Sequence, residues 1–199
     1  MATKSACAPC MVTLCAALLS SISPSLADSE SSNVAHIAAG PYGRCYAKSV
    51  PRHVYDPQGG ARQQGRTEIY RVGDRDDVLV TVYDWFSQRL FVKCSPPNDE
   101  TVVRIGPWQR GHVPTAEHLA IAFYRNGKLL KRYSTLDIAG DNPAAVAASI
   151  SHYTVFESGP EMVSVTTSSG PMFKEELEIR ARTVDGRELV FDLTTGELQ

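Results

Sequence analysis

The sequence lacks the motifs and the charge imbalance by which several large classes of protein are identified. Its 20 basic and 22 acidic residues give a formal net charge of −2, so no charge excess favours nucleic acid or anionic lipid. It contains no Gly-X-Ser-X-Gly, the motif that presents the nucleophile of many hydrolases. No two of its histidines stand at a metal-ligand spacing: His36, His53, His112, His118 and His152. We therefore expect no cofactor, no metal site and no nucleic-acid partner.

Long apolar runs are also missing, apart from one near the N-terminus. Lys4 precedes an apolar stretch at 11–22, and small residues then lead to Ala27. This order is typical of a secretory signal peptide that is cleaved after Ala27. The run is roughly a dozen residues, shorter than the about 20 that a membrane-spanning helix needs. We expect residues 1–27 to be removed, leaving a secreted or periplasmic chain with no membrane span.

Cysteine is scarce, and most of it falls in the expected signal peptide. Cys7, Cys10 and Cys15 would leave with residues 1–27, and with them the tempting Cys7-X-X-Cys10 spacing. The mature chain keeps Cys45 and Cys94. In an oxidising compartment such a pair is expected to form a disulfide. On the chain-entropy account this bond would stabilise the fold by about 4 kcal/mol.

The remaining chain divides by composition into an arm and one antiparallel β domain. Residues 28–66 are polar and rich in turn residues, which predicts an irregular arm. Residues 67–199 contain short runs of Val, Ile, Leu, Tyr and Phe between turns, as is typical of antiparallel sheets. The predicted strands cover 68–72, 78–83, 89–94, 101–105, 119–125, 128–133, 153–156, 162–166, 176–184 and 187–193.

Local signals add detail to this mostly β fold. Asn126-Gly127 and Asp185-Gly186 predict two-residue hairpin turns of type I′, in which both residues have positive φ. The strand at 78–83 is apolar on both faces, which predicts a central strand covered on both sides. Asn142 and Pro143 predict the start of a short helix that runs to Ile150. The pattern predicts a two-layer sandwich or a barrel with one short helix.

Two aromatic clusters at predicted strand ends are the most unusual local feature. The first is Tyr83, Asp84 and Trp85; the second contains Trp108 and Arg110. If the two ends adjoin, they would form a stacking surface for a sugar, a peptide or an aromatic ligand. The alternative is that the aromatic residues close the rim of a β core and that Asp84 caps a turn.

Charge is distributed unevenly along the chain. The segment 104–132 is basic and includes Arg125, Lys128, Lys131 and Arg132, whereas the segment 157–178 is acidic. Cross-strand pairing between the two segments would explain this distribution. The alternative is a basic face that recruits an acidic partner or a cell-envelope polymer.

Three classes of function are compatible with these features. The leading hypothesis is a non-catalytic exported module that binds an unknown protein or a cell-envelope polymer through the aromatic rim or the basic hairpin. The second is an exported hydrolase of a polymer or peptide that uses Asp84 or Asp137 with His112, which requires those groups to meet in a pocket. The third is a structural subunit of an envelope assembly, for which an exposed, unpaired strand edge or an apolar patch of more than roughly a few hundred Å² is expected.

Overall fold

The computed structural model describes residues 34–51, 65–169 and 172–199. The predicted signal peptide, 1–27, lies outside these residues, as do 28–33 and 52–64 of the predicted arm. The described chain is mostly β, with its strands in antiparallel sheets and one short α-helix. These sheets do not close into a barrel, so the predicted antiparallel class is confirmed in its sandwich form.

The first sheet has the strand order β1-β2-β3-β4. Its strands are β1 (His36–Ala39), β2 (Cys45–Val50), β3 (Arg66–Arg71) and β4 (Val78–Tyr83). The prediction of a wholly irregular arm is therefore wrong for 36–39 and 45–50. These residues form strands because Cys45, Ala47 and Ser49 alternate inward and are buried, while the residues between them face outward.

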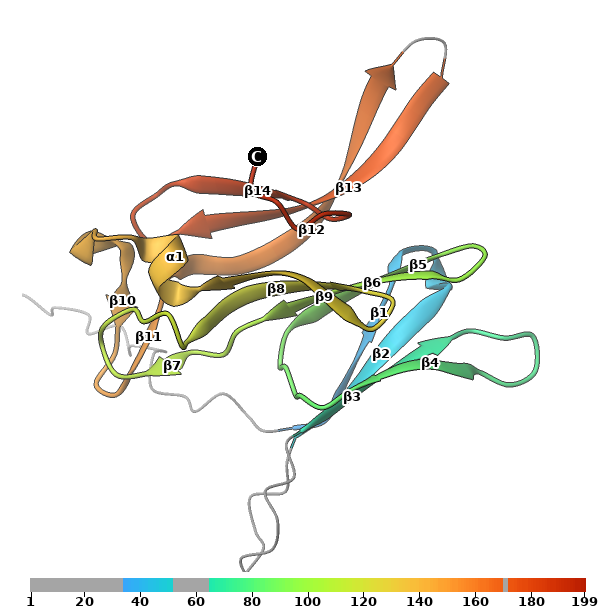
Figure 1. The fold of residues 1–199 in the computed structure, drawn as a ribbon, viewed down its shortest axis with the longest axis horizontal. Helices are drawn as coiled ribbons and strands as arrows, with labels where there is room; N and C mark the ends of the chain where they lie inside the picture. The colour runs from blue at the N-terminus through green and yellow to red at the C-terminus, as the bar shows by residue number, and fades with distance from the viewer. Residues whose placement is uncertain (1–33, 52–64, 170–171) are drawn as a thin grey trace, which may run out of the picture.

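The middle and outer sheets complete the layered structure. The middle sheet has the order β5-β6-β8-β9, with β5 (Leu90–Ser95), β6 (Asp99–Ile105), β8 (Leu119–Arg125) and β9 (Lys128–Ser134). The outer sheet contains β12 (Phe156–Ser169), β13 (Met172–Thr183) and β14 (Glu188–Asp192). Figure 1 shows the middle sheet lying between the other two. A small sheet of β10 (Ala147–Ala148), β11 (His152–Thr154) and β7 (Gln109–Arg110) lies at one end.

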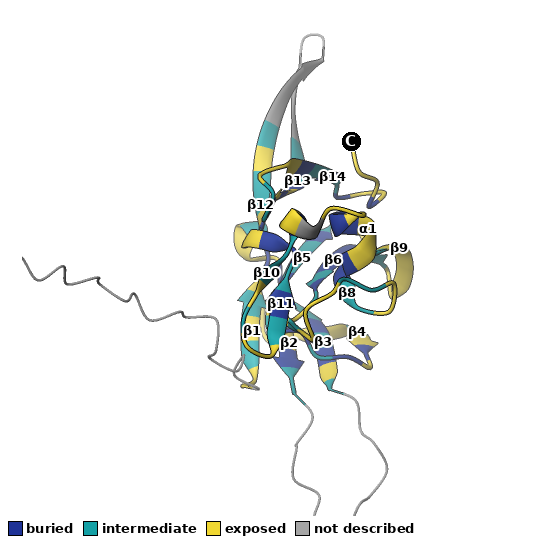
Figure 2. Cartoon of the chain, turned by 90° about the vertical axis from the view of Figure 1, so that its left-hand side faces the viewer, coloured by how far each residue is buried: buried dark blue, intermediate teal, exposed yellow. Residues whose placement is uncertain are grey.

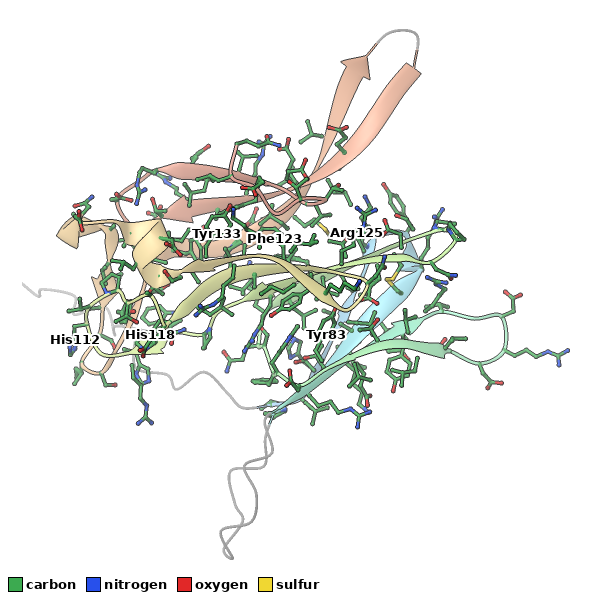
Figure 3. The ribbon with its side chains drawn as sticks, viewed as in Figure 1. Tyr83, His112, His118, Phe123, Arg125 and Tyr133 are labelled. Atoms are coloured by element: carbon green, nitrogen blue, oxygen red, sulfur yellow. A yellow bond between two sulfur atoms is a disulfide. The ribbon has the colours of Figure 1, made fainter. Side chains whose placement is uncertain are left out.

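The middle sheet buries apolar side chains on both of its faces. On one face, Val92 and Val102 pack with Ile69 of the first sheet. On the other, Val103 and Phe123 pack in a separate cluster that includes the outer sheet. In Figure 3, Tyr83 lies on the first-sheet side of this layer and Phe123 on the outer-sheet side. Because neighbouring residues of a strand point to opposite faces, β6 contributes Val102 to one core and Val103 to the other.

The strand predicted to be central is instead an edge strand. β4 ends the first sheet, and its Val78, Leu79, Val80 and Val82 are between 37% and 59% exposed. Figure 2 shows the buried segments gathered between the sheets. β6, by contrast, lies between β5 and β8 in the middle sheet, although it carries the charged residues Glu100 and Arg104. The apolar content of a strand therefore does not predict whether it lies inside a sheet or at its edge, because charged side chains can be buried when they form bonds in the core.

The two hairpin predictions are confirmed as hairpins, but only one turn has the predicted geometry. Asn126 and Gly127 both have positive φ, 49° and 79°, as a type I′ turn requires. At the other hairpin Gly186 has a φ of 85°, and Asp185 has no positive φ. The amide of Thr183 bonds the carbonyl of Arg187, which gives a three-residue loop. The side chain of Asp185 accepts bonds from Thr183 and Arg187, so its backbone stays in an ordinary conformation.

The helix predicted from Asn142 to Ile150 is wrong in extent. Asn142 does cap a helical turn by accepting a bond from the amide of Ala144, but only Pro143–Ala145 is helical, and as a 3-10 turn. The chain then extends into β10, which pairs with β11. The α-helix of the structure is α1 (Thr135–Ala139), which the sequence analysis missed. Its signal is a capping box between Ser134 and Asp137.

Candidate functional site

The predicted aromatic rim separates into a buried cluster and an exposed tryptophan. Tyr83 and Trp85 are only 5% and 7% exposed, and both pack in the core between the first and middle sheets. They stack on each other with ring centroids 4.9 Å apart, and both contact Tyr124. Trp108 is 41% exposed. The ligand-binding interpretation of Tyr83 and Trp85 is therefore replaced by a structural role.

A buried cation completes this cluster. The Arg104 guanidinium lies over the indole ring of Trp85, with Cζ 4.8 Å from the ring centroid. Burial lowers the pKa of Arg104, while Tyr124 and Asp84 act in the opposite direction. Asp84 itself is exposed, directly after β4. It thus lies near the cluster without being part of the buried stack.

Trp108 lines a cleft of about 230 Å³ where three segments meet. The segment before β5 contributes Gln88 and Arg89, the end of β6 and the loop after it contribute residues 105–108, and the third segment includes Phe156 and Glu157. The lining thus combines flat apolar groups with a cation and a carboxylate. Such a surface stacks against the flat face of a ring and offers donors to its oxygens.

Hydrogen bonds to backbone carbonyls of β8 flank Trp108 on both sides. The amide of Gly106 donates to the carbonyl of Ala120 at 2.8 Å, and Nε2 of Gln109 donates to the carbonyl of Leu119 at 3.0 Å. A Cβ on Gly106 would lie only 1.8 Å from the oxygen of Leu119. Glycine is required for this close approach of two backbone segments, which fixes the loop that carries Trp108.

Arg89 is the residue of this cleft that sequence reasoning missed. The guanidinium lies against Gly159, where a Cβ would come within 1.6 Å of Nη1. The backbone of Arg89 is fixed as well, since its carbonyl accepts bonds from the hydroxyl of Ser87 and the amide of Ile105. Nothing in the sequence pairs 89 with 159, because the contact joins segments 70 residues apart.

The remaining predicted site residues lie at the end of the molecule that carries the small sheet. Arg110 is exposed on β7, opposite His152. Nε2 of His112 contacts the carbonyl oxygens of Ser149 and Ile150 at 3.1 and 3.0 Å. Figure 3 shows His112 and His118 at this end, away from Tyr83. His112 thus joins the loop after β7 to the turn between β10 and β11.

The carboxylates considered for hydrolysis have other roles in the structure. Asp137 accepts bonds from the amide and hydroxyl of Ser134 at 2.7 and 2.8 Å, and these bonds lower its pKa. It thereby caps α1. Asp84 follows β4 in the first sheet, whereas His112 contacts the small sheet. Among the described residues, no hydrogen bond joins any two of these three groups.

The predicted basic face is divided, and two of its four cations are paired with carboxylates, whereas Lys128 is exposed at the start of β9. Arg125 forms a two-point ion pair with Asp99, at 2.7 and 3.1 Å. Lys131 pairs with Glu197 at 3.0 Å, and Arg132 donates to the carbonyl of Glu117. Lys131 and Arg132 point to opposite faces of β9, because they are neighbours along a strand. These partners lie outside the acidic segment 157–178, so the predicted pairing of the two segments is wrong for these cations.

Comparisons with known proteins give no further information. No protein-family model, no curated protein and no solved structure matches this chain. Within 34–51, 65–169 and 172–199, no group of three His, Cys, Asp or Glu side chains is placed to hold a metal ion. In the same ranges no helix has the length and hydropathy of a membrane span.

Proposed function

We propose that this protein is an exported, non-catalytic binding module whose ligand is a ring-containing unit of a cell-envelope polymer, held in the cleft beside Trp108. The single observation that carries the proposal is the exposure of Trp108, at 41%, on a loop that hydrogen bonds attach to β8 on both sides of this residue. A large aromatic side chain kept in solvent on a fixed loop can stack on a ligand with little loss of conformational entropy.

The chemistry of the cleft favours a saccharide with an acidic group. Trp108 and the neighbouring Pro107 give exposed flat apolar surfaces, and Arg89 adds a cation. Glu157 also lines the cleft, but its carboxylate is paired with Arg182 at 3.0 Å. Arg89 is therefore the group that we expect to meet a ligand carboxylate, in a charge-assisted hydrogen bond.

Export is proposed on two grounds. The order of residues in 1–27 is that of a secretory signal peptide. The disulfide between Cys45 and Cys94 is the kind of bond that persists in oxidising compartments. Mass spectrometry of the protein isolated from its source is expected to find Asp28 as the first residue, and an intact N-terminus would overturn this part.

The binding proposal is tested by calorimetric titration with trigalacturonic acid and, as the uncharged counterpart, maltotriose. We expect the acidic sugar to bind more tightly, and Trp108→Ala to weaken it about tenfold, the effect of losing one stacking contact. Arg89→Gln is expected to remove the preference between the two sugars. Ile150→Ala is the matched control, since it trims an apolar residue that is 83% exposed and lies outside the cleft lining.

Tryptophan emission gives an independent readout, because the chain has two tryptophans in contrasting environments. In Trp85→Phe, the remaining Trp108 should respond to ligand; in Trp108→Phe, the buried Trp85 should not. Equal affinity of wild type and Trp108→Ala for trigalacturonic acid, or no binding of either sugar, would rule out the proposed ligand class at this cleft.

A further inference from the structure

β4 presents an unusually apolar strand edge that pairs with no other strand within residues 34–51, 65–169 and 172–199. It pairs with β3 on one side and ends the first sheet on the other. Its sequence, Val-Leu-Val-Thr-Val-Tyr, contains no charge and no proline, and four of its side chains are exposed. The turn at Gly127 approaches the side chains of Thr81 and Tyr83, which face inward to Glu100. Strand edges of this kind accept another strand, and proteins usually protect them with charges or proline.

A second copy of the chain is a poor occupant of this edge. Asp77 directly precedes β4 and Asp84 directly follows it, and both are exposed. Two antiparallel copies of β4 paired through Val78 and Tyr83 would set Asp77 of each copy opposite Asp84 of the other. Like charges directly opposite each other are destabilising. Parallel pairing of two copies in register also sets like charges side by side.

The shape of the edge argues against self-association too. The register of β3 and β4 shifts at Val80, which leaves that residue without an opposite partner. Such a bulge bends and twists the strand, and this hinders the growth of a flat stack of copies.

The acidic residues at the two ends of β4 favour a binding partner with basic residues at the ends of its strand. The loop 74–77 contains Asp74, Asp76 and Asp77 against Arg75 alone. Asp77 is held at the start of β4 by the hydroxyl of Tyr46, at 2.9 Å. Acidic groups thus stand at both ends of an apolar strand. We propose that β4 receives an extended segment of another protein that has alternating apolar side chains and lysine or arginine at each end.

The test is fluorescence anisotropy with a labelled peptide, Lys-Lys-Val-Thr-Val-Thr-Val-Lys-Lys, added to the purified protein in low salt. Saturable binding is expected, together with loss of binding when the peptide backbone is N-methylated and when both lysine pairs are replaced by glutamate. The double variant Asp77→Asn with Asp84→Asn should weaken binding about fivefold, because two charge contacts are removed. Asp141→Asn, an exposed acid elsewhere, is the matched control.

Val80→Pro gives a second, independent test, because proline removes a backbone donor at the edge. Its circular dichroism spectrum is compared with that of wild type to check that it folds. If Val80→Pro does not fold, the double variant Asp77→Asn with Asp84→Asn still tests the proposal. No binding of the lysine peptide to wild type overturns the proposal, as does binding that the aspartate changes leave intact. A concentration-dependent dimer of wild type that Val80→Pro abolishes identifies a second copy as the occupant and likewise overturns it.

Discussion

The hydroxyl of Tyr83 donates a 2.8 Å hydrogen bond to Oε1 of Glu100, across the interface between the first and middle sheets. Thr81 donates to the other oxygen of the same carboxylate. Glu100 has no exposed surface, so these two donors replace the water that it would otherwise bind. Burial and the nearby Glu100 raise the pKa of Tyr83 well above its ordinary value, which keeps the hydroxyl protonated as a donor.

Tyr83→Phe is expected to lower the free energy of unfolding by about 1–3 kcal/mol, because it leaves a buried carboxylate oxygen without its donor. Urea denaturation followed by circular dichroism measures the change. The matched control is Tyr70→Phe, since the Tyr70 hydroxyl also bonds a carboxylate, that of Glu68, but on the outward side of the first sheet. If the two variants lose the same free energy of unfolding, the burial of Glu100 does not determine the effect of removing the Tyr83 hydroxyl.

Reduction of the disulfide is expected to weaken the attachment of the first sheet. Cys45 lies on β2 and Cys94 on β5, so the bond joins the first sheet to the middle sheet. Replacing both cysteines by alanine should cost about 2–5 kcal/mol in urea unfolding. Dithiothreitol should destabilise wild type by a similar amount and leave the double variant unchanged. An unchanged wild-type unfolding midpoint in dithiothreitol contradicts this expectation.

Asp185 should make the last hairpin sensitive to acid. Hydrogen bonds from Thr183 and Arg187 lower its pKa from 3.8 to about 2. A carboxylate with a depressed pKa stabilises the fold above its unfolded-state pKa, and this contribution is lost as the pH falls through the folded-state value. Asp185→Asn should therefore reduce the loss of stability between about pH 4 and pH 2. Thermal unfolding measured at several pH values across this range gives the loss of stability. If wild type and Asp185→Asn lose stability equally as the pH falls, Asp185 is not the group responsible.

Gly106 and Gly159 should respond very differently to the same substitution. At Gly106 an added methyl group meets the backbone oxygen of Leu119, which cannot move without disturbing β8. Gly106→Ala should therefore cost about 3 kcal/mol or more. At Gly159 the methyl group meets the end of the Arg89 side chain, which can swing away. Gly159→Ala should cost less than about 1 kcal/mol in chemical denaturation. Similar losses of stability in the two variants would contradict this contrast.

Gly159→Ala should still weaken sugar binding, because the added methyl group moves the Arg89 side chain out of the cleft.

Several local features of the fold could be predicted because their causes lie within a few residues. Asn126 and Gly127 accept positive φ, so the turn between β8 and β9 was expected and found. Short apolar runs between turn residues located most strands, including Leu119–Arg125. The disulfide was predicted because two cysteines remain once the expected signal peptide is removed, and because that peptide implies an oxidising compartment. No geometric argument entered the prediction.

The candidate site was predicted only in part, because exposure depends on distant segments. Trp85 and Trp108 both follow predicted strands and look alike in the sequence. Tyr124 and Arg104 cover Trp85, whereas Trp108 stays in solvent beside Arg89. No local pattern carries this difference.

The amino-acid sequence by itself determined the β class, most strand positions, the hairpins and the pairing of Cys45 with Cys94. The order of strands within the sheets was decided only by the tertiary structure. That order made β6 a central strand despite its charges, because Glu100 found Tyr83 as a donor and Arg104 found Trp85. It also left the apolar β4 at an edge. Backbone preferences act over a few residues, whereas burial is set by contacts between segments far apart in the chain.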